Sequence, residues 1–182
     1  ILAPMAAQRL ASVSISLTTL DADLARKMEP RAPAPKRRLA VIRALSAAGI
    51  PVRVQVSPLV PGLTDHELEA VMAAAAEAGA SHATSIPLRL PREVAALFRD
   101  WIETTFPDRA AHVMNRVREL HGGRDYDPQF GIRMTGQGIW AELIKRRKEV
   151  ARRRYGLERG LPKLRCDLFA VPPKAGDQLS LF

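Results

Sequence analysis

The sequence has very little cysteine and no long apolar run. Cys166 is the only cysteine among 182 residues, which excludes an internal disulfide and is typical of a cytoplasmic protein. It stands alone in LRCDLF, and we interpret it as a small apolar residue. No apolar stretch is long enough to cross a bilayer. The sequence therefore predicts a cytoplasmic chain without a membrane partner.

An initiator methionine is also lacking. The chain opens with ILAPMAAQRL, which looks like the inside of an apolar helix. A cleaved signal peptide also removes the methionine, but a mature secreted protein rarely starts within such a helix. We therefore expect a fragment whose N-terminal part is missing. A chain of 182 residues can itself bury one good core.

Acidic residues are too few to balance the basic ones, and the net charge is +9. Of this excess, +7 lies within residues 139–165, where ten Lys or Arg accompany Glu142, Glu149 and Glu158. A clustered basic surface attracts nucleic acid, although a solvated helix face explains the same run without a partner. The candidate phosphate contacts are Lys145, Arg146, Arg147, Arg152, Arg153 and Arg154.

Apolar strands alternate with helical patterns in the first half of the chain. Strands are predicted at residues 13–17, 52–57 and 82–88. The helices begin after a capping Asp21, near Lys36, and after a capping-box pattern at Thr64 and Glu67. This alternation predicts an α/β fold with parallel strands, whose ligands lie at the carboxyl ends of the strands.

After Leu90 the alternation ends. Two amphipathic helices, a polar loop and a last long helix from about Ile139 to Gly156 are predicted, followed by a Pro-rich tail. We expect three parts, which are residues 1–90, a helical extension at 91–160, and a flexible tail at 161–182.

Four segments of the first half together resemble a known family. SISLTTLD, MEPR, PAPKRRLAVIRALSAAGIPV and VSPLVPGLTDHE are similar in order and spacing to the second half of radical S-adenosylmethionine (SAM) proteins. The group they resemble most is the spore-photoproduct-lyase-like one, often labelled DNA repair photolyase. The resemblance runs from about residue 2 to about residue 155. It implies that residues 1–90 form the second half of a partial, TIM-like (β/α)6 barrel, with a helical C-terminal extension.

The resemblance also implies two cofactors, SAM and a 4Fe-4S cluster. In this family three thiolates at CxxxCxxC spacing hold the cluster, which cleaves SAM to generate a 5′-deoxyadenosyl radical. With a single cysteine this chain departs from that pattern. We therefore expect cluster ligands outside the chain, and no activity from the chain alone. The four histidines show no metal-binding spacing, so no metal ligand is assigned.

By the same resemblance, SAM-binding residues follow the first two strands. Ser16 and Thr18 match groups that approach the ribose or methionine part. Glu29 could accept from a ribose hydroxyl or an ammonium, and Arg38 could pair with the SAM carboxylate. Ser57 opens the SPLVPG turn, where the family cradles adenine. Packed small residues, a surface ion pair or a rigid turn would explain the same residues without a ligand.

The last five residues, QLSLF, resemble the bacterial sliding-clamp-binding motif. Gln178 would serve as a polar anchor, and Leu179, Leu181 and Phe182 would fill an apolar pocket. The PPKAGD segment before them would act as a flexible tether. An apolar tail that docks on its own domain is the alternative.

Two functions therefore fit the sequence. The favoured one is the C-terminal portion of a radical SAM enzyme that acts on nucleic acid. The alternative is a non-catalytic adaptor that binds nucleic acid through the last helix and a sliding clamp through the tail. Neither catalytic residues nor a substrate can be named from these residues.

Overall fold

Three parallel strands form one open sheet in a computed structural model that describes residues 1–172 and 174. They are β1 (Val13–Ser16), β2 (Val52–Leu59) and β3 (His82–Pro87), in the order β1-β2-β3. Val13 lies opposite Val52, and Gln55 lies opposite Thr84. The predicted α/β fold with a parallel sheet is confirmed, and the sheet of this chain is not closed into a barrel.

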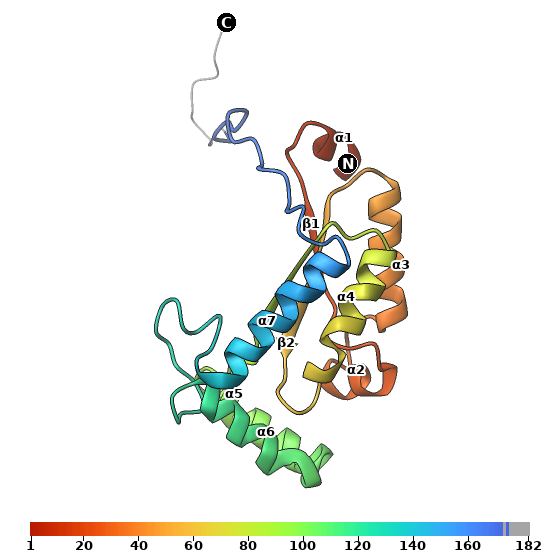
Figure 1. Cartoon of the computed structure of the whole chain (residues 1–182). Coiled ribbons are helices and arrows are strands. Elements are labelled where there is room, and N and C mark those ends of the chain that lie inside the picture. The colour runs from red at the N-terminus through yellow and green to blue at the C-terminus, as the bar shows by residue number, and fades with distance from the viewer. Residues whose placement is uncertain (173, 175–182) are drawn as a thin grey trace, which may run out of the picture.

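Three helices pack with the sheet to form the main core. α3 (Pro35–Ala47) connects β1 to β2, and α4 (Leu68–Glu77) connects β2 to β3. α7 (Gly138–Arg154) lies beside α4 and along β3 (Figure 1). Trp140, Ala141 and Ile144 of α7 belong to the same apolar cluster as Val54 and Met72. α7 thus occupies the position of a crossover helix after β3.

A second apolar cluster lies at the carboxyl ends of the strands. The hairpin of α5 (Val94–Thr105) and α6 (Pro107–Leu120) packs there against α2 (Ala22–Met28) and the segments that follow β2 and β3. In Figure 1 this hairpin is the green pair at the lower end of the molecule. A short α1 (Leu2–Ala7) precedes β1, and a 3-10 turn (Asp65–Glu67) precedes α4. The predicted three-part division of the chain stays a prediction.

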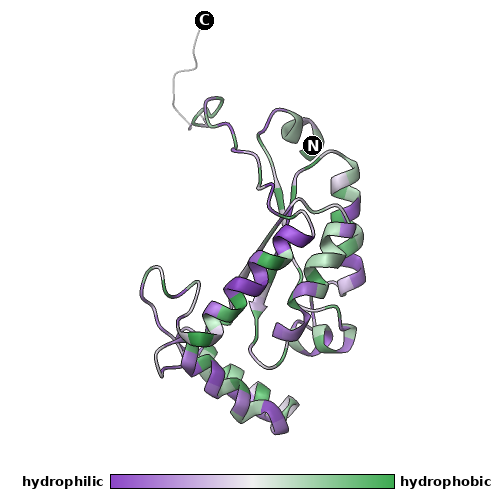
Figure 2. Cartoon of the chain, viewed as in Figure 1, coloured by the Kyte–Doolittle hydropathy of each residue, from purple (hydrophilic) through white to green (hydrophobic). Residues whose placement is uncertain are grey.

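The two faces of the sheet differ in polarity. Val52, Val54 and Val56 of β2 face the helices and are at most 1% exposed. The alternating residues Ser14 and Ser16 of β1 are exposed, and Arg53, Gln55 and Thr84 are partly exposed. Side chains alternate between the faces of a strand, so the second face of this sheet is polar. In Figure 2, hydrophilic and apolar residues likewise alternate along α7.

The helix ends confirm one predicted cap and correct another. Asp21 caps α2, because its side chain accepts hydrogen bonds from the backbone N–H groups of Asp23 and Leu24. The capping box predicted at Thr64 and Glu67 is wrong. Thr64 makes no side-chain cap and instead accepts from the backbone N–H of Val60, at 2.9 Å. The Glu67 carboxylate binds residues that follow β1.

Within residues 1–172 and 174, no helix is both long and apolar enough to cross a bilayer.

Candidate cofactor-binding site

Arg38 is the centre of a polar network at the carboxyl end of β1. Its guanidinium donates to Glu29 Oε2 at 2.9 Å and to the carbonyl and hydroxyl oxygens of Ser16 at 3.0 Å each. Its Nε donates to the Pro33 carbonyl at 2.9 Å. Because Arg38 lies in the first turns of α3 and Glu29 directly follows α2, the network joins both helices to β1. We call Ser16, Thr18, Glu29, Arg38 and Ser57 the Arg38 cluster.

Thr18 and Ser57 extend the Arg38 cluster to β2 and β3. The Thr18 hydroxyl lies 3.2 Å from Glu29 Oε2 and 3.2 Å from the Ser57 carbonyl, so it can donate to either oxygen. The Ser57 hydroxyl accepts from the backbone N–H of Ile86 at 2.8 Å. The structure therefore brings together all five residues that the sequence analysis proposed for SAM. That they bind SAM stays a prediction.

The atoms of the Arg38 cluster differ in how far a ligand can reach them. Arg38 and Thr18 are 8% and 2% exposed, and the hollow beside them has no room for a water molecule. Ser16 is exposed, and the Glu29 side chain is 32% exposed. Thr18 and Arg38 both contact Oε2 of Glu29, which leaves Oε1 without a hydrogen-bond partner among the described residues. The Ser16 hydroxyl and Glu29 Oε1 are therefore the atoms that can meet a ligand.

These two atoms suit the polar groups of a nucleoside or an amino acid. A carboxylate oxygen accepts from a hydroxyl or an ammonium, and a serine hydroxyl both donates and accepts. The Arg38 guanidinium is already bonded through Nε, Nη1 and Nη2. Four of its five N–H groups are used, so it could offer a carboxylate of SAM only the second N–H of Nη2. Its geometry is that of a residue that positions Glu29 and Ser16.

The sequence analysis missed two residues that support this edge of the sheet. Glu67 Oε2 accepts from the backbone N–H of Leu20 at 2.8 Å, and Oε1 is hydrogen-bonded to the Thr19 hydroxyl. Thr19 is 1% exposed and directly follows Thr18. The sequence pattern did not reveal this contact, because a glutamate at this position can either cap the following helix or bind the residues after β1.

The chain does not fit a 4Fe-4S cluster. The described residues contain no group of three His, Cys, Asp or Glu side chains that could hold a metal ion. Cys166 is exposed, and the sequence has no second cysteine. An iron–sulfur cluster needs several thiolates, so its ligands would have to come from outside these residues.

The basic residues of α7 point in different directions. Arg147 donates to both carboxylate oxygens of Glu69 on α4, at 2.7 and 2.6 Å. This hydrogen bond is the main reason why the pKa of Glu69 is lowered and that of Arg147 is raised. Arg153 lies 3.6 Å from Glu158, and Arg146 and Arg154 are exposed. Nucleic-acid binding by this helix stays a prediction. Of its proposed phosphate contacts, Arg147 is the least available to a phosphate, because it is paired with Glu69.

The predicted clamp-binding residues Gln178, Leu179, Leu181 and Phe182 lie outside the described residues.

The first part of the chain is similar to known proteins. Residues 1–75 match the model of the Radical SAM superfamily. The uncharacterized proteins Mb2609c of Mycobacterium bovis and Rv2578c of Mycobacterium tuberculosis are each 35% identical to the chain over 149 residues. That match covers 81% of this chain and 43% of each relative, so the chain spans less than half the length of these relatives. No solved structure gives a significant match. The segment that matches the Radical SAM superfamily model, residues 1–75, includes the whole Arg38 cluster.

Proposed function

We propose that this chain is the C-terminal part of a radical SAM enzyme and that the Arg38 cluster binds SAM. One observation carries the proposal. Within the matched segment, Ser16, Thr18, Glu29, Arg38 and Ser57 converge at the carboxyl end of a parallel sheet. Ligands of parallel α/β proteins bind at this end of the strands.

In this proposal some residues of the Arg38 cluster contact SAM and others position them. Glu29 Oε1 accepts from a ribose hydroxyl or from the ammonium of SAM, and the Ser16 hydroxyl supplies a second polar contact. Arg38 holds both side chains in place, and the Thr18 hydroxyl, which follows β1, can donate to the same oxygen of Glu29. In the intact protein, a reduced 4Fe-4S cluster would supply the electron that cleaves SAM, with thiolates from outside this chain.

We further propose that the sheet forms the second half of a (β/α)6 barrel. β1 and β3 are the edge strands of the sheet, and apart from one isolated bridge between His82 and Glu158 their outer edges pair with no other strand among the described residues. The polar face with Ser14, Ser16, Gln55 and Thr84 suits a barrel interior that binds a polar cofactor. The relatives are more than twice as long as the matched region, which leaves enough chain for the remaining strands.

SAM binding to the intact protein tests the proposal. Glu29→Gln and Ser16→Ala should each weaken SAM binding by about tenfold or more, as expected for the loss of a hydrogen bond to a charged or polar group. Iron content should stay at the wild-type level, because neither residue is a cluster ligand. Ser14→Ala is the matched control, since Ser14 is exposed on the same face of β1 but hydrogen-bonds to Arg53. Wild-type affinity in both site variants would exclude the Arg38 cluster as the SAM site.

A further inference from the structure

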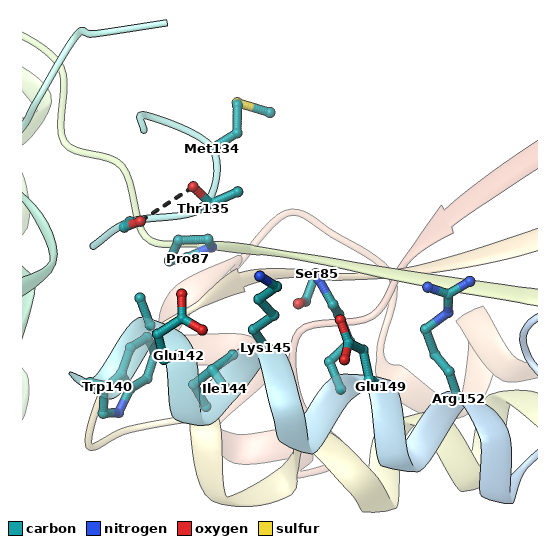
Figure 3. A pocket seen from close by; sticks show the side chains of 13 residues that line it. Ser85, Pro87, Met134, Thr135, Trp140, Glu142, Ile144, Lys145, Glu149 and Arg152 are labelled. Carbon is teal, nitrogen blue, oxygen red and sulfur yellow. Dashed lines mark hydrogen bonds between the residues drawn. The ribbon is translucent and has the colours of Figure 1, made fainter. Parts of the chain in front are cut away.

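A cavity of about 260 Å³ lies between β3 and α7. Ser85 and Pro87 line it from β3, and Met134 and Thr135 close one end. Figure 3 shows the side chains of α7 that point into it from the opposite side. Ser85 lies opposite Val56 in the strand register and therefore faces the helix-covered side of the sheet. The cavity is thus separate from the polar face that carries Ser16.

Three cations of α7 line this cavity. They are Lys145, Lys148 and Arg152, whose spacing places them along one face of the helix. Neither lysine ammonium makes an ion pair or hydrogen bond with the described residues, and the Ser85 hydroxyl is equally free. In Figure 3 the Lys145 ammonium points toward Ser85 and Pro87. The cavity is thus lined by three donor groups without partners among the described residues, which are the ammonium groups of Lys145 and Lys148 and the Ser85 hydroxyl.

The electrostatic environment of Lys148 favours an anion. Its pKa is lowered, first by burial and then by the charges of Arg152 and Lys145, whereas Glu149 has the opposite effect. Arg152 is held in place by contacts to the Leu157 carbonyl at 3.4 Å and to His82 Nδ1 at 3.5 Å. An anion between these cations would relieve their mutual repulsion.

Two carboxylates limit what the cavity can hold. Glu142 and Glu149 also line it, so the three cations exceed the anions by one charge. A long polyanion would meet both carboxylates, whereas a single anionic group can sit between the ammonium groups and the Ser85 hydroxyl. The charge balance therefore fits one oxyanion better than a nucleic-acid strand.

We propose that this cavity binds one oxyanion, the phosphate or carboxylate group of a small ligand, through Lys145, Lys148 and the Ser85 hydroxyl. Arg152 adds positive charge from the far end of the cavity. The site is independent of the Arg38 cluster and does not depend on SAM binding. It gives the chain a second ligand site on the helix-covered side of the sheet.

Labelling of the intact protein with pyridoxal 5′-phosphate tests this proposal. The aldehyde forms an imine with a lysine amine and releases water, and borohydride then reduces the imine to a stable amine that mass spectrometry can map. We expect Lys148 or Lys145 to be labelled at least about tenfold more by pyridoxal 5′-phosphate than by pyridoxal, which lacks the phosphate. Equal labelling by the two reagents would overturn the proposal.

Competition and matched variants separate a built site from general positive charge. Inorganic phosphate should suppress the labelling if the ligand group is a phosphate, and acetate should suppress it better if the group is a carboxylate. Arg152→Gln and Ser85→Ala should each reduce labelling severalfold. Arg146→Gln removes the same charge from the outer side of α7 and should leave it unchanged. Loss of labelling in the Arg146 variant, or no protection by either anion, would refute the site.

Discussion

Arg38 and Glu29 form an ion pair of 2.9 Å in which the arginine side chain is 9% exposed and the glutamate side chain 32%. The pair joins the beginning of α3 to the residue that directly follows α2. Because the same guanidinium also binds Ser16 and Pro33, one side chain joins α2 and α3 to the carboxyl end of β1.

Removal of the Arg38 guanidinium should therefore cost stability as well as binding. Arg38→Met leaves Glu29 partly buried without its cation, and we expect unfolding to become easier by about 2–4 kcal/mol. Arg38→Lys retains the charge but not the several bonds, and it should lose less. Denaturant unfolding of the intact protein measures both. A midpoint equal to that of wild type in the Met variant would show that the network contributes little.

The ion pair between Glu69 and Arg147 should make stability depend on pH. The pKa of Glu69 is lowered in the folded protein by its hydrogen bond to Arg147. The stabilisation is therefore complete above the unfolded-state pKa and is lost as the pH falls through the folded-state pKa. We expect Glu69→Gln to cost no more than about 1 kcal/mol at neutral pH, because the pair is partly exposed. Urea unfolding should show that the difference in unfolding free energy between wild type and Glu69→Gln becomes smaller as the pH falls below the ordinary pKa of glutamate.

Salt dependence tests whether α7 binds nucleic acid. If the exposed Arg153 and Arg154 contact phosphates, replacing both with Gln should reduce the slope of log affinity against log salt by about 0.9 per contact on duplex DNA. Arg147→Gln is the control, since Arg147 is paired with Glu69. An unchanged slope in the double variant would assign this part of α7 to solvated surface.

Reconstitution with iron and sulfide tests the absence of cluster ligands from this chain. The 182-residue chain has one cysteine, and we expect it to acquire no stable 4Fe-4S cluster and to cleave no SAM. Iron analysis and absorption spectroscopy measure the result. A stoichiometric cluster in this chain would contradict the proposed source of the ligands.

The tail prediction can be tested with a peptide. A peptide that ends in QLSLF should bind a bacterial sliding clamp, with Leu181 and Phe182 as the main anchors. Replacing both with Ala should abolish binding in a fluorescence-anisotropy titration. Equal binding by the two peptides, or none by either, would reduce QLSLF to an apolar tail.

The local patterns of the sequence predicted most of the fold. The strands near Val13, Val52 and His82 and the Asp21 cap appear where apolar runs and capping chemistry placed them. The five residues of the Arg38 cluster were proposed from a family resemblance, and their proximity follows from the parallel order of the strands. Apolar runs and helix caps can be predicted because they depend on residues that are close together in the sequence.

Contacts between distant residues could not be predicted in this way. Glu67 matches a local capping box, but its carboxylate binds Leu20, 47 positions away. Arg147 belongs to a uniform basic run, and only its packing against α4 shows that Glu69 is its partner. The position of α7 was equally hidden, because its contact with β3 spans the whole α5–α6 hairpin.

This interruption between β3 and α7 has a consequence for the order of folding. The connections from β1 to β2 and from β2 to β3 are both shorter than the one from β3, which ends at Pro87, to α7, which begins at Gly138. Each of the two shorter connections contains a helix, α3 or α4, that packs with the sheet. Closing a longer loop costs more chain entropy and slows the contacts that depend on it. We therefore expect the strands with α3 and α4 to assemble first and α7 to dock last. During synthesis, the apolar side of α4 would stay uncovered until the ribosome has released the residues of α7.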